Sequence, residues 1–226
     1  MSGARFAALD EAALRQALVH CAVALERAGL NRGTTGNASA RLAGGLLITP
    51  SGVPADELSA VAMVLLDASG AVIGPGRPSS EWRLHQDILA ARPLVQAVVH
   101  THAPFATSLA CLGLDLPAFH YMVAVAGGVD VRCAPYELFG TQALSNVALQ
   151  ALQGRKACLL ANHGMVTLGA DLDEALAISV EIESLCGMYW RALQLGQPSI
   201  LNDAQMAAVL ERFKDYGCAA QPTQAP

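Results

Sequence analysis

Charged and aromatic side chains are scarce in this sequence. Of its 226 residues, 15% are charged and 5% are aromatic, whereas 53% are hydrophobic. The net charge is −5 and no run of basic residues occurs, which argues against nucleic acid as a partner. A surface so poor in charge is typical of a chain whose faces are covered by other subunits, so we expect a homo-oligomer.

Long hydrophobic runs and paired cysteines are also missing. No apolar segment approaches the roughly 18 residues that a membrane span requires, so no membrane partner is expected. Arg5, Asp10 and Arg15 interrupt the first stretch, and we therefore expect no signal peptide. The 6 cysteines are scattered without a C-x-x-C pair, which suits small buried side chains in a reduced compartment. Together these absences predict a cytoplasmic protein.

Neither a repeat nor a linker divides the chain. This predicts a single domain over residues 1–226, with a mobile tail from about residue 217 to 226. Hydrophobic spacing predicts a helix that contains Leu14–Leu25. A second, longer helix is expected to open at a capping box beginning with Asp171 and to run to about Leu195.

Short hairpins are predicted in the first third of the chain. Turn residues at Gly44-Gly45 and at Asp67–Gly70 each lie between short apolar runs. Hairpins joined this closely imply a largely antiparallel sheet. Farther along, Val129–Val131 is a candidate for another short strand.

The most informative stretch runs from Pro78 to His102. It begins with Pro78-Ser79-Ser80-Glu81, which is typical of a helix N-terminus because serines can cap and a carboxylate favours the positive end of a helix. The helix is expected to end near Arg92-Pro93, and an apolar run then leads to His100-Thr101-His102. Residues two apart in a strand point to the same face, so the two imidazoles would lie side by side. Such a pair is two-thirds of a tri-histidine metal site.

A third histidine follows another predicted strand, at Asn162-His163-Gly164. A His-x-His pair alone is as readily structural as metal-binding, but a third histidine at a strand end and a carboxylate at a helix start favour a divalent metal site. The predicted ligands are His100, His102, His163 and Glu81. Zn²⁺ suits this set, and Mn²⁺, Co²⁺ and Fe²⁺ stay open as alternatives. Glu81 could also act as a base, provided that burial raises its pKa.

Three turns rich in hydroxyl groups and glycine precede the histidine pair. By itself the first of them favours an ordinary turn over an anion-binding loop. If the three converge, their backbone and side-chain donors would bind a phosphate, aided by the positive end of the helix after Ser80. The residues concerned are Thr35, Gly36, Asn37, Ser51, Gly52, Ser79 and Ser80. No G-x-x-x-x-G-K-[ST] motif occurs, which excludes a nucleotide P-loop.

A metal, a base and a phosphate cradle suit one kind of chemistry, the making and breaking of a C–C bond in a sugar phosphate through an enediolate. Six motifs carry a resemblance that fits this chemistry: T-T-G-N-A-S, T-P-S-G-V-P, R-P-S-S-E-W, V-V-H-T-H-A-P-F-A-T, F-H-Y-M-V-A-V-A-G-G and N-H-G. They fall in the order of the class II aldolase/adducin family, over roughly residues 10 to 215. The branch that the chain resembles most is that of the L-fuculose-1-phosphate aldolases.

This resemblance implies a three-layer α/β/α fold around a mostly antiparallel sheet, assembled as a homotetramer with sites between subunits. It implies that the three histidines hold one Zn²⁺ per subunit and that Glu81 is both a metal neighbour and the base at the dihydroxyacetone phosphate carbon. The seven turn residues would bind the substrate phosphate. Tyr121, which by itself favours a half-buried aromatic role, matches the tyrosine that enters a neighbouring subunit's site and protonates the aldehyde oxygen.

The implied activity is that of a metal-dependent lyase, which cleaves a ketose 1-phosphate such as L-fuculose 1-phosphate to dihydroxyacetone phosphate and a short aldehyde. Three alternatives stay open: a decarboxylase of a phosphorylated keto-acid, a pentulose-phosphate 4-epimerase, and a non-catalytic interaction module like adducin. The last conflicts with the presence of all three histidines, because adducin-like members lack them. Tyr216 is a loose candidate for a tail tyrosine at the site. His85 and His120 match no ligand position and are interpreted as supporting or structural residues.

Overall fold

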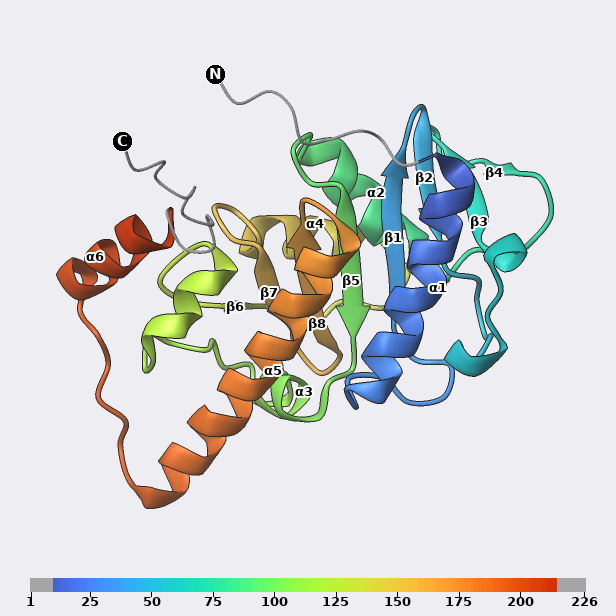
Figure 1. The fold of residues 1–226 in the computed structure, drawn as a ribbon. Helices are drawn as coiled ribbons and strands as arrows, with labels where there is room; N and C mark the ends of the chain where they lie inside the picture. The colour runs from blue at the N-terminus through green and yellow to red at the C-terminus, as the bar shows by residue number, and fades with distance from the viewer. Residues whose placement is uncertain (1–9, 215–226) are drawn as a thin grey trace, which may run out of the picture.

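The computed structural model describes residues 10–214. The predicted mobile tail and Tyr216 lie outside these residues, so both stay predictions. Within them, a single eight-stranded sheet has the order β4-β3-β2-β1-β5-β8-β7-β6 (Figure 1). Its strands are β1 Asn37–Leu42, β2 Gly45–Ile48, β3 Val64–Asp67, β4 Val72–Ile73, β5 Ala97–Thr101, β6 Arg132–Ala134, β7 Ala157–Leu160 and β8 Gly164–Gly169.

Antiparallel pairing dominates the sheet, as the sequence predicted. Both expected hairpins form, β1 with β2 and β3 with β4. Among the strands that the structure describes, only β6 and β7 pair in parallel. The strand expected at Val129–Val131 forms slightly later, as β6, because Val131 itself is drawn into an isolated bridge with Leu116.

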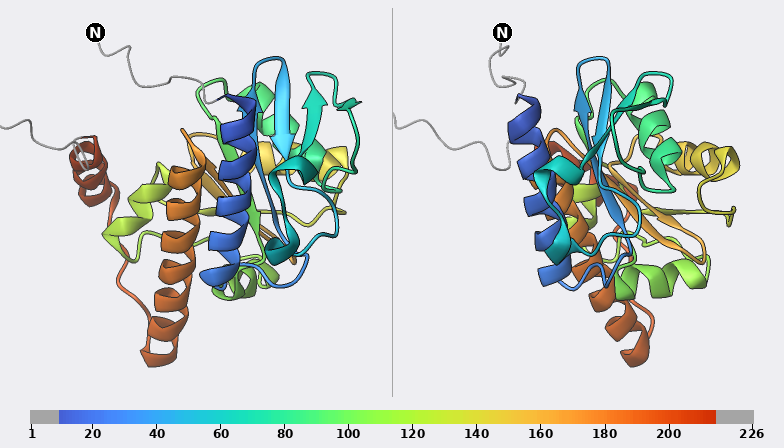
Figure 2. Two further views of the ribbon diagram at one scale, coloured as in Figure 1. Left: turned by 45° about the vertical axis from the view of Figure 1, so that its right-hand side comes forward. Right: turned by 90° about the vertical axis from the view of Figure 1, so that its right-hand side faces the viewer.

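Helices cover both faces of the sheet. Figure 2 shows α1 and α5 on one side and α2 and α4 on the other, with α3 near the lower end of the sheet. The helices are α1 Glu11–Arg27, α2 Trp82–Ala91, α3 Pro104–Cys111, α4 Gln142–Ala151, α5 Leu172–Leu195 and α6 Asp203–Phe213. Three short 3₁₀ segments, η1 Ala55–Glu57, η2 Ala60–Ala62 and η3 Tyr121–Ala126, complete the described part. The predicted three-layer α/β/α arrangement is therefore confirmed.

Two hydrophobic clusters correspond to the two faces of the sheet. Residues of α1 and α5, such as Leu18 and Ile182, pack with one set of strand residues. Residues of α2 and α4, such as Ile88 and Leu144, pack with the other set. The central strand β5 has every residue buried and contributes to both clusters, so its end is held firmly in place. Among the described residues, no helix combines the length and apolar character of a membrane span.

Candidate metal and active site

Four side chains from three separate segments converge at one end of β5. His100 lies in β5, His102 follows its last residue, His163 lies in the turn between β7 and β8, and Glu81 directly precedes α2. One potential ligand atom from each of the four lies within 4.8 Å of the others. The centroids of the three imidazole rings are 4.7–5.0 Å apart. The structure thus brings together all four residues predicted as metal ligands.

The start of α2 is built to present Glu81 to this cluster. The Pro-Ser-Ser-Glu sequence predicted a helix with Glu81 in its first turn, but α2 begins at Trp82 and Glu81 occupies the capping position without making a side-chain cap. Its carboxylate instead faces the imidazoles, with Oε2 3.1 Å from His100 Nε2 and Oε1 3.3 Å from His163 Nε2. Glu81 is only 6% exposed.

A tight turn places His163. Asn162 has φ of 56°, in the left-handed region that asparagine tolerates better than most residues. The Asn162 N–H donates to Ala110 O at 3.1 Å, and the His163 N–H donates to Leu160 O at 3.0 Å. A Cβ atom on Gly164 would lie 2.2 Å from Thr101 O, so glycine is required for β8 to approach the end of β5 this closely.

The hydrogen bonds around the cluster fit a bound cation. His100 Nδ1 lies 3.0 Å from Met165 O, which can only accept, so Nδ1 carries a proton, and in the neutral form of the ring Nε2 offers a lone pair. That lone pair faces His102 Nε2 at 3.0 Å. Glu81 Oε1 is buried and has no hydrogen-bond partner among residues 10–214. A divalent cation would satisfy these acceptors together, and a second hydrogen bond that orients a ligating histidine is usual at metal sites.

The charges of the four groups are strongly coupled. Burial raises the pKa of the Glu81 carboxyl, but His100, His163 and the amide of Asn37 lower it more, so it lies well below its ordinary value. Burial lowers the pKa of His100, but the charge of Glu81 outweighs that effect and raises it. Burial and the neighbouring His100 lower the pKa of His102 and that of His163 to about 4.

The condition set for Glu81 as a base, that burial raise its pKa, is therefore not met by the chain itself. Ion pairing outweighs desolvation, and the carboxylate is ionised at neutral pH. As an ionised group it is ready to accept a proton, but only weakly basic while it remains paired with the imidazoles.

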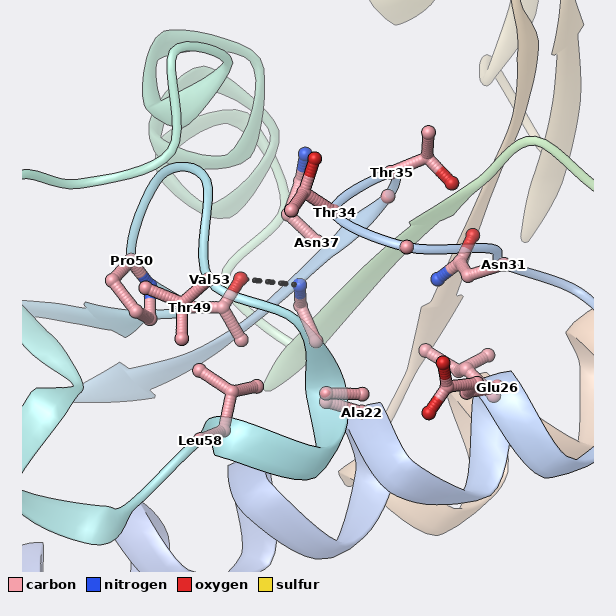
Figure 3. A pocket seen from close by; sticks show the side chains of 15 residues that line it. Ala22, Glu26, Asn31, Thr34, Thr35, Asn37, Thr49, Pro50, Val53 and Leu58 are labelled. Carbon is pink, nitrogen blue, oxygen red and sulfur yellow. Dashed lines mark hydrogen bonds between the residues drawn. The ribbon is translucent and has the colours of Figure 1, made fainter.

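Hydrogen bonds also join the three predicted phosphate-binding turns. The Ser51 N–H donates to Arg77 O at 3.0 Å, and the Ser79 N–H donates to Thr49 O at 3.1 Å. The Ala38 N–H donates to Thr49 Oγ1 at 3.2 Å (Figure 3). The turns thus lie side by side, whereas their binding of phosphate stays a prediction.

A pocket beside these turns contains part of the predicted set. Its lining includes Thr35, Gly36 and Asn37, together with Asn31 and Thr34 (Figure 3). Pro50 and Val53 line it, whereas Ser51, Gly52, Ser79 and Ser80 are not among its lining residues. The Thr35 hydroxyl donates to Arg32 O at 2.8 Å and thereby closes its own turn. The amide of Asn37 points away from the loop, toward Glu81 and His85.

Tyr121 begins the 3₁₀ segment η3 and is 48% exposed. Its ring lies against that of His120, with centroids 4.9 Å apart. His120 Nδ1 accepts from the Met122 N–H and caps η3, as suits the structural role expected for it. The role of Tyr121 at a neighbouring subunit's site stays a prediction.

His85, interpreted from the sequence as a supporting or structural residue, has specific partners in the fold. This residue is fully buried and is hydrogen-bonded to both Asn37 and Ser39. A signal was present, because His85 follows Glu81 by four residues and residues four apart lie on the same helix face. Asn31 was treated only as part of a loop, yet its side-chain oxygen accepts from the His102 N–H at 3.3 Å.

Comparisons with known proteins agree with this geometry. The model of the family "Class II Aldolase and Adducin N-terminal domain" matches residues 16–190. The "5-methylthioribulose-1-phosphate/5-deoxyribulose-1-phosphate aldolase" of Rhodospirillum rubrum is 55% identical over 214 residues, which cover 95% of this chain and 97% of that protein. The "L-fuculose phosphate aldolase" of Escherichia coli K12 is 42% identical over 205 residues, or 90% and 95% of the two chains. A solved structure of "L-fuculose 1-phosphate aldolase" has a TM-score of 0.87 at 39% identity and covers 94% of this chain and 100% of its own.

These matches confirm the family that the sequence motifs indicated. They bear out the expected branch only in part, since a relative with another named substrate is more similar than the fuculose phosphate aldolases compared above. The fold, the four converging ligands and a family match that covers most of the chain lead to one conclusion: the chain belongs to the class II aldolase and adducin family.

Proposed function

We propose that this chain, a class II aldolase, cleaves 5-methylthioribulose 1-phosphate or 5-deoxyribulose 1-phosphate to dihydroxyacetone phosphate and a short aldehyde. The observation that carries the proposal is the cluster of Glu81 with three histidines, whose potential ligand atoms lie within 4.8 Å of one another. The substrate is inferred from the 55% identity to a relative that carries these two substrates in its name.

Cleavage breaks the bond between C3 and C4 of the ketose. The hydroxyl on C4 loses its proton and becomes the aldehyde, while the electron pair of the broken bond passes to the C3 side and C3 is finally protonated. The site therefore needs one group that exchanges a proton at C3 and another that does so at the C4 oxygen. Glu81 serves the first need, and Tyr121 of a neighbouring subunit serves the second.

His100, His102, His163 and Glu81 would hold the divalent cation, which we propose to be Zn²⁺, with Mn²⁺, Co²⁺ or Fe²⁺ as alternatives. When bound, such an ion supplies a Lewis acid that polarises the carbonyl and hydroxyl oxygens of the substrate. Glu81 becomes a stronger base once substrate binding weakens its contacts with His100 and His163, because those contacts hold its pKa down.

The three adjoining turns are proposed to bind the substrate phosphate. Backbone N–H groups and hydroxyls of neutral turns can bind an anion without a strong positive charge. The supporting observation is that hydrogen bonds hold the turns together beside the metal-ligand cluster. The residues are Thr35, Gly36, Asn37, Ser51, Gly52, Ser79 and Ser80, of which Asn37 would contribute its backbone, because its side-chain amide is bound to Glu81 and His85.

One chemical difference separates this substrate from L-fuculose 1-phosphate. Fuculose phosphate releases an aldehyde with a hydroxyl on the neighbouring carbon, whereas the pentulose phosphates release one with a methylthio group or only hydrogen there. A site that hydrogen-bonds a hydroxyl strongly rejects substrates that lack it, while an apolar site discriminates weakly. The ratio of kcat/KM for the pentulose phosphates to kcat/KM for L-fuculose 1-phosphate therefore shows whether the site around this carbon is apolar or hydrogen-bonds a hydroxyl.

The test is a substrate panel assayed with zinc-loaded protein. We expect kcat/KM for 5-methylthioribulose 1-phosphate to exceed that for L-fuculose 1-phosphate by roughly tenfold or more, the difference that one apolar group provides. A preference for fuculose phosphate would overturn the substrate, and carbon dioxide release from a phosphorylated keto-acid without aldehyde formation would favour the decarboxylase. We further propose that the chain acts as one domain in a cytoplasmic homotetramer.

A further inference from the structure

A row of hydrogen bonds leads from Glu81 into the core. The Asn37 side-chain N–H donates to Glu81 Oε2 at 3.0 Å. The other end of the same amide, Asn37 Oδ1, is hydrogen-bonded to His85 Nε2. His85 Nδ1 in turn lies 2.7 Å from Ser39 Oγ. All four residues are at most 7% exposed, so solvent does not compete for these bonds.

Two regular elements create this row. Asn37 and Ser39 are two residues apart in β1 and project from the same face, roughly 7 Å from each other along the strand. Glu81 and His85 are four residues apart at the start of α2, which is roughly 6 Å along a helix. Because the two repeats nearly match, side chains from the strand and from the helix can alternate as Glu81, Asn37, His85 and Ser39.

The direction of every hydrogen bond follows from the carboxylate. An ionised Glu81 can only accept, so the NH₂ end of Asn37 must face it and Oδ1 must face His85. His85 Nε2 therefore carries the proton, and Nδ1 must accept from the Ser39 hydroxyl. Burial and the neighbouring His100 lower the pKa of His85 to about 3, which keeps the ring in the neutral form that this pattern needs.

The row treats the two oxygens of Glu81 differently. Oε2 is held by Asn37, whereas Oε1 is buried and finds no hydrogen-bond partner in the described part of the chain. Asn37 also pairs with His100 across β1 and β5, so the same residue sets the spacing between the carboxylate and a metal ligand. If the amide of Asn37 turned over, its oxygen would face a carboxylate oxygen, and the carboxylate would be pushed out of place.

We infer that His85 and Ser39 are positioning residues, which lock the amide of Asn37 so that it fixes Glu81 for metal binding and for proton exchange at the substrate carbon. This inference rests on the proposed function, since it assigns Glu81 to that chemistry. It differs from a merely structural role because the side-chain amide is oriented, in addition to being buried.

The test compares His85→Phe with His85→Gln. Phenylalanine keeps a ring but removes both nitrogens, whereas glutamine can still donate to Asn37 and accept from Ser39. The first readout is the visible absorption spectrum of the Co²⁺-substituted protein, which reports the ligand geometry without any substrate. The second is the exchange of the C3 hydrogen of dihydroxyacetone phosphate with deuterium from water, which needs no aldehyde. His20→Phe, on the exposed face of α1, is the control for loss of a histidine.

We expect His85→Phe to change the Co²⁺ spectrum and to lower the exchange rate roughly 10- to 100-fold, mainly in kcat, while His85→Gln restores most of both. Ser39→Ala should change the spectrum in the same direction with a smaller loss of rate. If His85→Phe does not fold, Ser39→Ala decides the matter alone. An unchanged spectrum and rate in the folded variant would overturn the inference. A changed spectrum in a protein whose wild type exchanges no C3 hydrogen would support the positioning of Glu81 and overturn the proposed function instead.

Discussion

The two oxygens of Glu81 lie in different surroundings, and this difference suits the two roles proposed for the residue. Oε2 contacts Asn37 and His100, while Oε1 faces His163 without a hydrogen bond. Glu81→Gln keeps the shape and the contact with Asn37 but removes the charge and the basicity. We expect turnover to fall by roughly 10²- to 10⁴-fold, the usual contribution of a general base.

Metal analysis of Glu81→Gln separates its two roles. The three histidines remain, so we expect the variant still to bind Zn²⁺, with lower affinity. Glu211→Gln on the exposed face of α6 is a matched control and should keep full activity. Full turnover by a metal-loaded Glu81→Gln protein would show that another residue is the base.

His85 makes the stability of the metal-free protein depend on pH. Its pKa is about 3 in the folded chain, where burial disfavours the charged ring, against an ordinary value of 6.5. Between these values the unfolded chain binds more protons than the folded one, so the free energy of unfolding decreases as the pH falls. The contribution of this residue approaches about 1.4 kcal/mol per pH unit inside that window and vanishes above it.

Urea unfolding of chelator-treated protein between about pH 7 and pH 4 measures this dependence. In His85→Gln, the slope of the free energy of unfolding against pH should be smaller by the amount that the binding of about one proton contributes. Equal slopes for the two proteins would mean that His85 does not remain neutral in the folded state. The pKa values of His102 and His163 are also lowered, so in both proteins these two residues likewise make the free energy of unfolding decrease as the pH falls.

At the level of single residues, the sequence predicted the metal ligands well because strand periodicity and strand ends are local features. His100 and His102 share a face, and His163 follows a buried run, as expected. The sequence did not reveal the partner of His85, because Asn37 and Ser39 are far away along the chain and meet it only when β1 and α2 pack together. Local sequence could not decide whether burial would raise the pKa of Glu81 either, since that pKa depends on imidazoles from two other segments.

Among the elements, the turn between β7 and β8 is the most demanding part of the site. Asn162 adopts a left-handed conformation directly before His163. Asn162→Val should destabilise the protein by roughly 1–2 kcal/mol, because a β-branched side chain is strained there. It should also weaken Zn²⁺ binding by displacing the imidazole, as competition with a chelator would measure.

Asn162→Gly is the matched control for this change, because glycine adopts the same conformation without strain. It should retain both stability and metal affinity. If valine were tolerated as well as glycine, the turn would not constrain His163.

The helix α2 shows where reasoning from local sequence ends. Its capping signals were correctly interpreted as a helix start. However, Ser79 accepts only a 3.3 Å hydrogen bond from the Glu81 N–H, and the Glu81 side chain makes no capping hydrogen bond. A capping carboxylate would stabilise the helix by about 1 kcal/mol, and here the same carboxylate pairs with histidines instead. The conflict between a local preference and a contact made across the fold is what marks this helix start as functional.

For the whole molecule, exposed aromatic and aliphatic side chains favour assembly. Several large apolar side chains are exposed on the surface of the single chain, each by 47–60%, namely Tyr121, Tyr136, Leu138, Phe139 and Trp190. Side chains of this kind are enriched at subunit interfaces. Light scattering should therefore give a mass near four times that of the 23.5 kDa chain. A monomer at working concentration would contradict both the tetramer and the shared site.

The proposed sharing of each site between neighbouring subunits makes a distinctive prediction for mixed assemblies. Tyr121→Phe alone should lower turnover by roughly 10²- to 10⁴-fold, as should Glu81→Gln alone. When the two variant chains are co-expressed, random assembly gives about one quarter of the sites an intact Glu81 from one chain and an intact Tyr121 from its neighbour. Activity should then rise to about that fraction of the wild-type value, far above either variant by itself. If both residues served the site of their own chain, every site would lack one of them, and mixing would restore nothing.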